Sequence, residues 1–160
     1  MKIGFEIVPV EQGRGGALYS LRFEGEEKTE RDKFLDNGEI QACKEFESLV
    51  VRLYDMVDSL GFRDNFFKLK KGSINDSVAA FHCNHGTLRL YCLRWSSILL
   101  IVGSGGSKTT RTYQGDPLLS DAVGKLQMVD KLFDERQKSR EIIIDPNTGI
   151  ITGNLVFTFD

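Results

Sequence analysis

The sequence VAAFHCNHGTLRLYCLRWSSILLIVG, residues 78–103, decides the fold of this chain. It contains three stretches rich in β-branched, aromatic and other apolar residues, a composition typical of strands. These strands are expected at Val78 to Cys83, Thr87 to Trp95 and Ser97 to Gly103. The breaks between them, Asn84 to Gly86 and around Ser96, are too short for the crossover that parallel neighbours require. The stretch therefore predicts an antiparallel meander.

Two amphipathic helices flank this meander. From Glu39 to Leu60, apolar residues recur at 3.6-residue spacing, and Gly61 follows as a stop. A second apolar stripe begins after Asp116 and Pro117, which suit the N-cap and first helical positions, and continues to Phe133. Together these patterns predict an α+β fold in which a small antiparallel sheet packs against two helices.

Hairpins are expected at both ends of the chain. Near the N-terminus, two alternating apolar and polar stretches surround a glycine-rich turn, and they predict a hairpin. The charged segment Glu24 to Gly38 is expected to be an exposed connector, with at most a frayed helical turn around Lys33 to Leu35. The last residues contain the turn sequence DPNTG between β-rich runs and predict a C-terminal hairpin extension. One domain is expected over 1–160, with the hairpin and connector in 1–38, the core in 39–140 and the C-terminal hairpin in 141–160.

Length and composition point to an ordinary globular domain. The chain has 160 residues, of which 41% are hydrophobic and 28% charged. Its three cysteines form no CxxC pair, which disfavours a disulfide framework and a four-cysteine zinc site. The longest aliphatic run, Ile98 to Val102, is five residues, whereas a membrane span needs about 20. Because Glu6 interrupts the apolar N-terminus, a signal peptide is not expected. These features predict a cytoplasmic protein with no membrane partner.

Charge is distributed unevenly along the chain. Residues 62–140 contain 13 Lys and Arg and 7 Asp and Glu, a net +6, whereas the remaining residues have a net −8. A basic block of this kind is typical of a surface that binds a nucleic acid or another polyanion. The alternative is a solvated surface with locally uneven charge.

The basic block includes a glycine-rich segment, VGSGGSKTTRTY, at residues 102–113. A phosphate-binding loop of the Walker A type would need glycine at Val102 and Ser107 and a helix beginning at the lysine, so no nucleotide cofactor is expected. Lys108, Arg111 and Tyr113 instead offer a point charge, a planar guanidinium and a stacking ring, which suit RNA. The alternative is a flexible hairpin tip with solvated cations.

Further basic residues lie on the neighbouring strands. Strand alternation places Arg89 and Tyr91 on one face and Arg94 on the other. The preceding stretch FFKLKKG adds three lysines, and with Arg94 these are the expected RNA-binding residues: Lys68, Lys70 and Lys71. His82 is either a structural histidine or a group that titrates near neutrality and moves a proton. Because His82 and His85 do not share a strand face, no metal site is expected, and no cofactor of any kind.

The order of these motifs resembles the RelE/HigB-type toxins of bacterial toxin–antitoxin systems. The similarity runs from the first amphipathic helix through FFKLKKG, AAFHCNHGTLRLYCLRW and SSILLIVGSGGSKTTRTY to the second helix, from Glu39 to Phe133. It implies a small antiparallel sheet packed against helices. It also implies metal-independent cleavage of messenger RNA on the ribosome and inhibition by an antitoxin protein.

The resemblance assigns roles by motif position. Arg89 matches the strand arginine that follows the glycine turn, and Lys108 or Arg111 matches the basic residue after the last core strand. Tyr113 matches a tyrosine that RelE-like members carry near the C-terminus. The chain departs from the family where the lysines of the preceding strand fall on His82 and Asn84, so the resemblance does not identify the general base.

Metal-free RNA cleavage needs a base for the 2′-hydroxyl, cations for the developing charge and an acid for the departing 5′-oxygen. Arg89 and Lys108 are expected to hold the phosphate, and Arg111 to neutralise the transition state or protonate the leaving group. Tyr113 would stack on a base. His82 or a lysine of the 68–71 cluster would be the general base. The rival function is a non-catalytic module whose sheet binds RNA or a protein.

Overall fold

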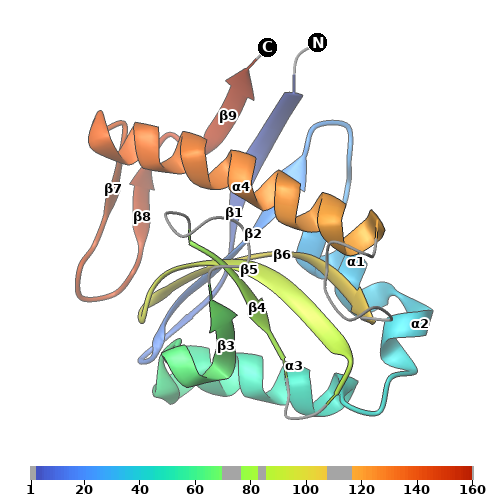
Figure 1. The fold of residues 1–160 in the computed structure, drawn as a ribbon. Coiled ribbons are helices and arrows are strands. Elements are labelled where there is room, and N and C mark those ends of the chain that lie inside the picture. The colour runs from blue at the N-terminus through green and yellow to red at the C-terminus, as the bar shows by residue number, and fades with distance from the viewer. Residues whose placement is uncertain (1–2, 70–76, 83–85, 108–116, 160) are drawn as a thin grey trace.

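The computed structural model describes residues 3–69, 77–82, 86–107 and 117–159, and its central feature is a mixed sheet of seven strands (Figure 1). In spatial order these are β3 (Phe67–Leu69), β4 (Val78–Phe81), β5 (Leu88–Ser96), β6 (Leu99–Ser107), β2 (Gly16–Phe23), β1 (Ile3–Gly13) and β9 (Val156–Phe159). A separate hairpin consists of β7 (Ile142–Ile144) and β8 (Ile151–Gly153).

Helices cover both faces of the sheet. In the described part of the chain these are α1 (Glu30–Asp36), α2 (Gly38–Gln41), α3 (Phe46–Asp55) and α4 (Pro117–Lys138). A π-helical turn, η1 (Met56–Leu60), continues α3, and a short 3-10 turn, η2 (Asp64–Phe66), precedes β3. Figure 1 shows α4 crossing one face of the sheet and α3 lying on the other. The predicted α+β class is confirmed, and none of the described helices is long and apolar enough to cross a membrane.

The central strands form the predicted antiparallel meander. Strands β3, β4, β5 and β6 pair antiparallel in sequence order. Alternation along β5 sends Tyr91 and Leu93 into the core beneath α4, and Leu90 and Cys92 into the core beneath α3. All four are buried. The meander therefore lies between two apolar layers.

The expectation of a small, wholly antiparallel sheet on two helices is wrong. Strand β2 lies beside β6 and runs parallel to it, with Ala17 opposite Leu99 and Ser20 opposite Val102. The chain between β2 and β6 contains α1, α2, α3 and three strands, which is long enough for a parallel return. The predicted N-terminal hairpin exists, but it extends the main sheet and is not an appendage.

The charged segment after this hairpin is more ordered than its composition predicts. Helix α1 begins after Thr29, whose side-chain hydroxyl accepts a hydrogen bond from the backbone N–H of Asp32 at 3.2 Å. Its Phe34 is 3% exposed and packs in the core on the α3 side of the sheet. The expectation of an exposed connector is wrong here because Phe34 and the partly buried Leu35 anchor an otherwise charged helix.

The predicted helix from Glu39 to Leu60 is broken. Helix α2 ends at Gln41, a turn follows, and α3 begins at Phe46. Asn37 caps α2 by accepting hydrogen bonds from the N–H groups of the next turn. The apolar face was identified correctly, since Leu49 and Leu53 are buried, but periodicity does not reveal the break between two helices that share one apolar face.

The C-terminal elements follow the prediction with two changes. Helix α4 extends to Lys138, and its expected N-cap, Asp116, lies outside the described residues. The predicted hairpin is β7–β8, and β9 adds to β1 at the edge of the main sheet. The third predicted strand, Ser97 to Gly103, continues as β6 as far as Ser107, where Gly105 and Gly106 lie opposite Leu90 and Arg89 of β5.

Candidate functional site

Strand register brings several of the predicted site residues to one end of the meander. His82 directly follows Phe81, which lies opposite Leu90 in β5. The neighbouring Arg89 lies opposite Gly106 in β6. One residue further along, Leu88 lies opposite Ser107, the residue that precedes Lys108 in the chain. Segments 25 residues apart in the sequence thus meet across three adjacent strands.

The same end of the sheet is polar. The hydroxyls of Thr87 and Ser107 are hydrogen bonded at 3.0 Å and exposed to solvent. The first turn of α4 also lies here, since Leu119 approaches Gly106 closely enough that a Cβ there would be 3.8 Å from its side chain. A helix N-terminus presents partial positive charge, which is favourable to anions.

Arg89 is largely enclosed at this end of the sheet. The residue is 8% exposed. Its Nη1 donates to the carbonyl oxygens of Gly86 at 2.6 Å and Leu88 at 3.0 Å. Arg89 therefore closes back on Gly86 and Leu88 at the start of β5. These two bonds use two of the five N–H donors of a guanidinium.

Arg94 does not join Arg89. It lies on the opposite face of β5, where its Nε donates to the carbonyl oxygen of Phe62 at 2.7 Å and its Nη2 forms an ion pair with Asp64 at 2.8 Å. This face separation follows from the strand alternation predicted from the sequence. The predicted catalytic Arg89 and the predicted RNA-binding Arg94 do not share one surface.

Of the remaining predicted residues, the structure describes Lys68 and His82. Lys68 lies on β3 opposite Ala80 and is exposed, whereas His82 is half-buried. Five of the predicted site residues lie outside the described residues: Lys70, Lys71, Lys108, Arg111 and Tyr113. Within the described ranges, His, Cys, Asp and Glu form no group of three or more able to hold a metal ion.

Glu45 belongs to this end of the sheet and was not predicted from the sequence. It lies just before α3, yet its carboxylate accepts a hydrogen bond from the backbone N–H of Leu88 at 2.6 Å. That hydrogen bond is the main cause of a lowered pKa for Glu45; partial burial opposes it, and the charge of Arg89 adds to the lowering. The only signal in the sequence is Gly86, where a Cβ would lie 2.7 Å from the Glu45 carboxylate.

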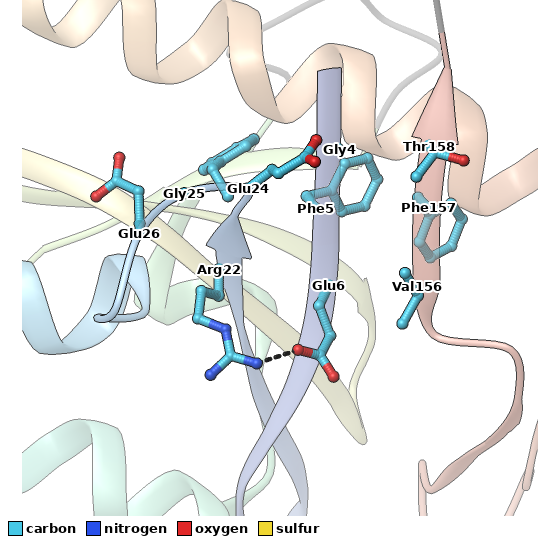
Figure 2. Close-up of a pocket in the computed structure, with 11 residues that line it drawn as sticks. Gly4, Phe5, Glu6, Arg22, Glu24, Gly25, Glu26, Val156, Phe157 and Thr158 are labelled. Carbon is cyan, nitrogen blue, oxygen red and sulfur yellow. Dashed lines mark hydrogen bonds and ion pairs between the residues drawn. The ribbon is translucent and has the colours of Figure 1, made fainter. Parts of the chain in front are cut away.

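A hollow lies beside the other edge of the sheet, among β1, the end of β2 and β9, and differs in chemistry from the end of the meander. Its volume is about 230 Å³. Figure 2 shows its lining side chains on β1, the end of β2 and β9, with Phe5 and Phe157 among them. Its lining carries three carboxylates, of Glu6, Glu24 and Glu26, and one guanidinium, of Arg22, which forms an ion pair with Glu6. Because carboxylates dominate, this hollow does not suit an RNA phosphate.

No protein-family model, curated protein or solved structure matches this chain. The residues and geometry at the end of the meander are therefore the basis for assigning a function.

Proposed function

We propose that this protein is a metal-independent endonuclease of messenger RNA, acting with the ribosome in the cytoplasm as the toxin of a toxin–antitoxin pair. The observation that supports this proposal is the strand register that groups His82, Arg89 and Ser107, the residue before Lys108, at one end of the meander. The sequence resemblance to RelE/HigB-type toxins points to the same residues.

The proposed reaction is an attack of the RNA 2′-hydroxyl on the adjacent phosphate. His82 or a lysine of the 68–71 cluster takes the hydroxyl proton, and Arg89 and Lys108 hold the phosphate oxygens. As the bond to the 5′-oxygen breaks, Arg111 neutralises the charge or donates a proton to that oxygen. Tyr113 stacks on a neighbouring base. No cofactor takes part in this scheme.

The enclosed position of Arg89 is compatible with phosphate binding. Among the described residues, two carbonyl bonds leave three donors of its guanidinium, and a fixed guanidinium loses less conformational entropy on binding than a free one. The proposal therefore expects Arg89 to contact RNA with the edge that does not face Gly86 and Leu88.

A second candidate function is a non-catalytic module that binds RNA or a protein. The burial of Arg89 favours it, because a residue that is 8% exposed and bonded to two carbonyls also fits a purely structural role. A module of this kind would bind an RNA or protein partner in place of the antitoxin expected for a toxin.

Induced expression in bacteria separates the two candidates. We expect the wild type to arrest growth and to cleave messages, and Arg111→Ala to lose about 100-fold in cleavage rate, the usual effect of removing a transition-state charge. Lys131→Ala, which removes an exposed lysine from α4, is the matched control and should behave as wild type. Purified protein treated with chelator and then freed of it should cleave message on ribosomes as fast as untreated protein.

The outcomes discriminate clearly. Normal growth with intact messages, or equal toxicity of the wild type and Arg111→Ala, rejects the proposed mechanism. RNA binding without cleavage favours the non-catalytic module. Binding to single-stranded RNA should weaken with salt, with a log–log slope of about −0.7 per phosphate contacted.

A further inference from the structure

Glu45 is placed where a helix-capping role would be expected, but it does not cap α3. It is the residue before the first turn of α3, and its side chain makes no hydrogen bond to the N–H groups of that turn. Its carboxylate instead reaches Leu88, 43 residues away in the sequence, at 2.6 Å. Since the helix gains no cap from this side chain, its use lies at the start of β5.

The carboxylate supplies an acceptor that no described residue of β4 provides. Strand β4 ends at Phe81, which lies opposite Leu90 in β5. Leu88 is two residues before Leu90, so it lies beyond the end of β4 and has no partner residue in that strand. A buried or half-buried N–H at such a strand end needs a partner. Glu45 is that partner for Leu88.

Gly86 makes this approach possible. A Cβ at Gly86 would lie 2.7 Å from both the carboxyl carbon and Oε1 of Glu45, which is shorter than a non-bonded contact of a Cβ atom. Any larger residue at this position would push the carboxylate away from Leu88. The glycine before β5 therefore serves the contact with Glu45.

Arg89 holds the other side of the same short segment. Its Nη1 donates to the carbonyl oxygens of Gly86 and Leu88, while Glu45 accepts from the N–H of Leu88. Two oppositely charged side chains thus bind the start of β5. The Glu45 carboxylate accepts from its N–H group, and the Arg89 guanidinium donates to its carbonyl oxygens. A shift of residues 86–88 would move the oxygens that orient the guanidinium.

We infer that Glu45 is a positioning residue of the candidate site, which holds residues 86–88 so that their carbonyls fix the guanidinium of Arg89 for an RNA phosphate. This inference rests on the proposed function for its phosphate, but the geometric part concerns this chain alone. Glu45 contacts the backbone of β5 and does not need to touch RNA.

Two variants and one control test the inference. Glu45→Ala removes the acceptor, Glu45→Gln keeps an oxygen that accepts from Leu88 but removes the charge, and Glu47→Ala removes an exposed acid from the same helix. Nitrogen-15 NMR of the arginine side chains reports whether the two Nη groups of Arg89 give separate signals, as slow rotation of a held guanidinium requires. Hydrogen exchange reports on the Leu88 amide.

In the wild type and in Glu47→Ala we expect separate Nη signals for Arg89 and a protected Leu88 amide. In Glu45→Ala we expect the Nη signals to merge and Leu88 to exchange about 10- to 100-fold faster, the effect of losing a charge-assisted hydrogen bond. Glu45→Gln should keep most of the Leu88 protection and give intermediate Arg89 signals. Unchanged Arg89 signals in Glu45→Ala overturn the inference.

RNA binding provides the functional readout. Glu45→Ala and Arg89→Ala should each weaken RNA binding about tenfold or more, and the double variant should bind no more weakly than Arg89→Ala, since both act through one group. Additive losses overturn the inference. A wild type that binds no RNA rejects the proposed function, while the Arg89 signals still decide whether Glu45 positions the guanidinium.

Discussion

Replacing Gly15 by alanine should loosen the contact between the N-terminal hairpin and the helical layer. The hairpin tip between β1 and β2 rests on η1, where the N–H of Gly15 donates to the carbonyl oxygen of Val57 at 2.8 Å. A Cβ at Gly15 would lie 2.8 Å from the Gly61 nitrogen and 3.0 Å from the Met56 carbonyl carbon, and it would overlap the oxygen of that carbonyl. All of these neighbours are backbone atoms, so no side chain can rotate away.

The size of the effect follows from two losses. Separating the hairpin from η1 lengthens the Gly15–Val57 hydrogen bond, a loss of about 0.5–1.5 kcal/mol. Forcing an extra methyl group into a packed region costs about 1–3 kcal/mol more. We therefore expect the free energy of unfolding to fall by about 2–4 kcal/mol, which corresponds to a drop in Tm of about 5–15 °C for a chain of this size.

Gly124→Ala is the matched control. Gly124 is an exposed residue within α4, and a Cβ there would meet no heavy atom within 4 Å. Alanine should therefore raise stability by about 0.5–1 kcal/mol, because glycine is a poor helix former. Urea unfolding of the three proteins measures both changes. If Gly15→Ala unfolds at the wild-type urea concentration, the close packing of the hairpin tip on η1 is refuted.

Four further predictions, three of substitutions and one of thiol labelling, test other parts of the structure. Phe34→Ala should lower the free energy of unfolding by about 3–5 kcal/mol in urea titrations, because its ring is 3% exposed. Arg136→Ala should increase amide exchange across β9, since Arg136 donates to two carbonyls beside that strand and its Cζ lies 3.7 Å from the ring centre of Phe157. Burial raises the pKa of Cys92, so mass-spectrometric mapping should find it unlabelled by thiolate reagents in the folded protein and labelled in urea. The pKa of Glu45 is lower in the folded than in the unfolded protein, so its ionised carboxylate stabilises the fold at any pH above the unfolded-state pKa. This stabilisation is lost as the pH falls through the folded-state pKa. Glu45→Gln should therefore make the free energy of unfolding less dependent on pH in the acid range.

Local sequence patterns predicted the parts of the fold that depend on neighbouring residues. The meander follows from breaks too short for a crossover, and the apolar stripe of α4 from its 3.6-residue spacing. The parallel pairing of β2 with β6 has no such local signal, because it joins segments about 80 residues apart. Helix α1 is longer and more ordered than the frayed turn expected around Lys33 to Leu35, because the burial of Phe34, with Leu35 packed against the same core, outweighs a run of charges. Its cap, Thr29 followed by Asp32, was the available sign.

The candidate site also has features that local sequence predicts and features that it does not. Once the meander is known, its register places His82 near Arg89, and strand alternation separates Arg89 from Arg94; both follow from residues that are close in sequence. The surroundings of Arg89 do not, because sequence cannot state whether an arginine beside a glycine turn faces solvent or its own backbone.

The surroundings of Arg89 depend on the contact from Glu45 to Leu88. This contact is made possible by the break between α2 and α3, where the apolar periodicity predicts a single helix. The break frees Glu45 from a helix interior, and Gly86 leaves room for its carboxylate. Each feature alone is uninformative, since a lone glutamate and a lone glycine occur at many turns. Only their convergence on the strand end that Arg89 also grips gives the glutamate a use, and for that reason the function of Arg89 has to be tested together with Glu45.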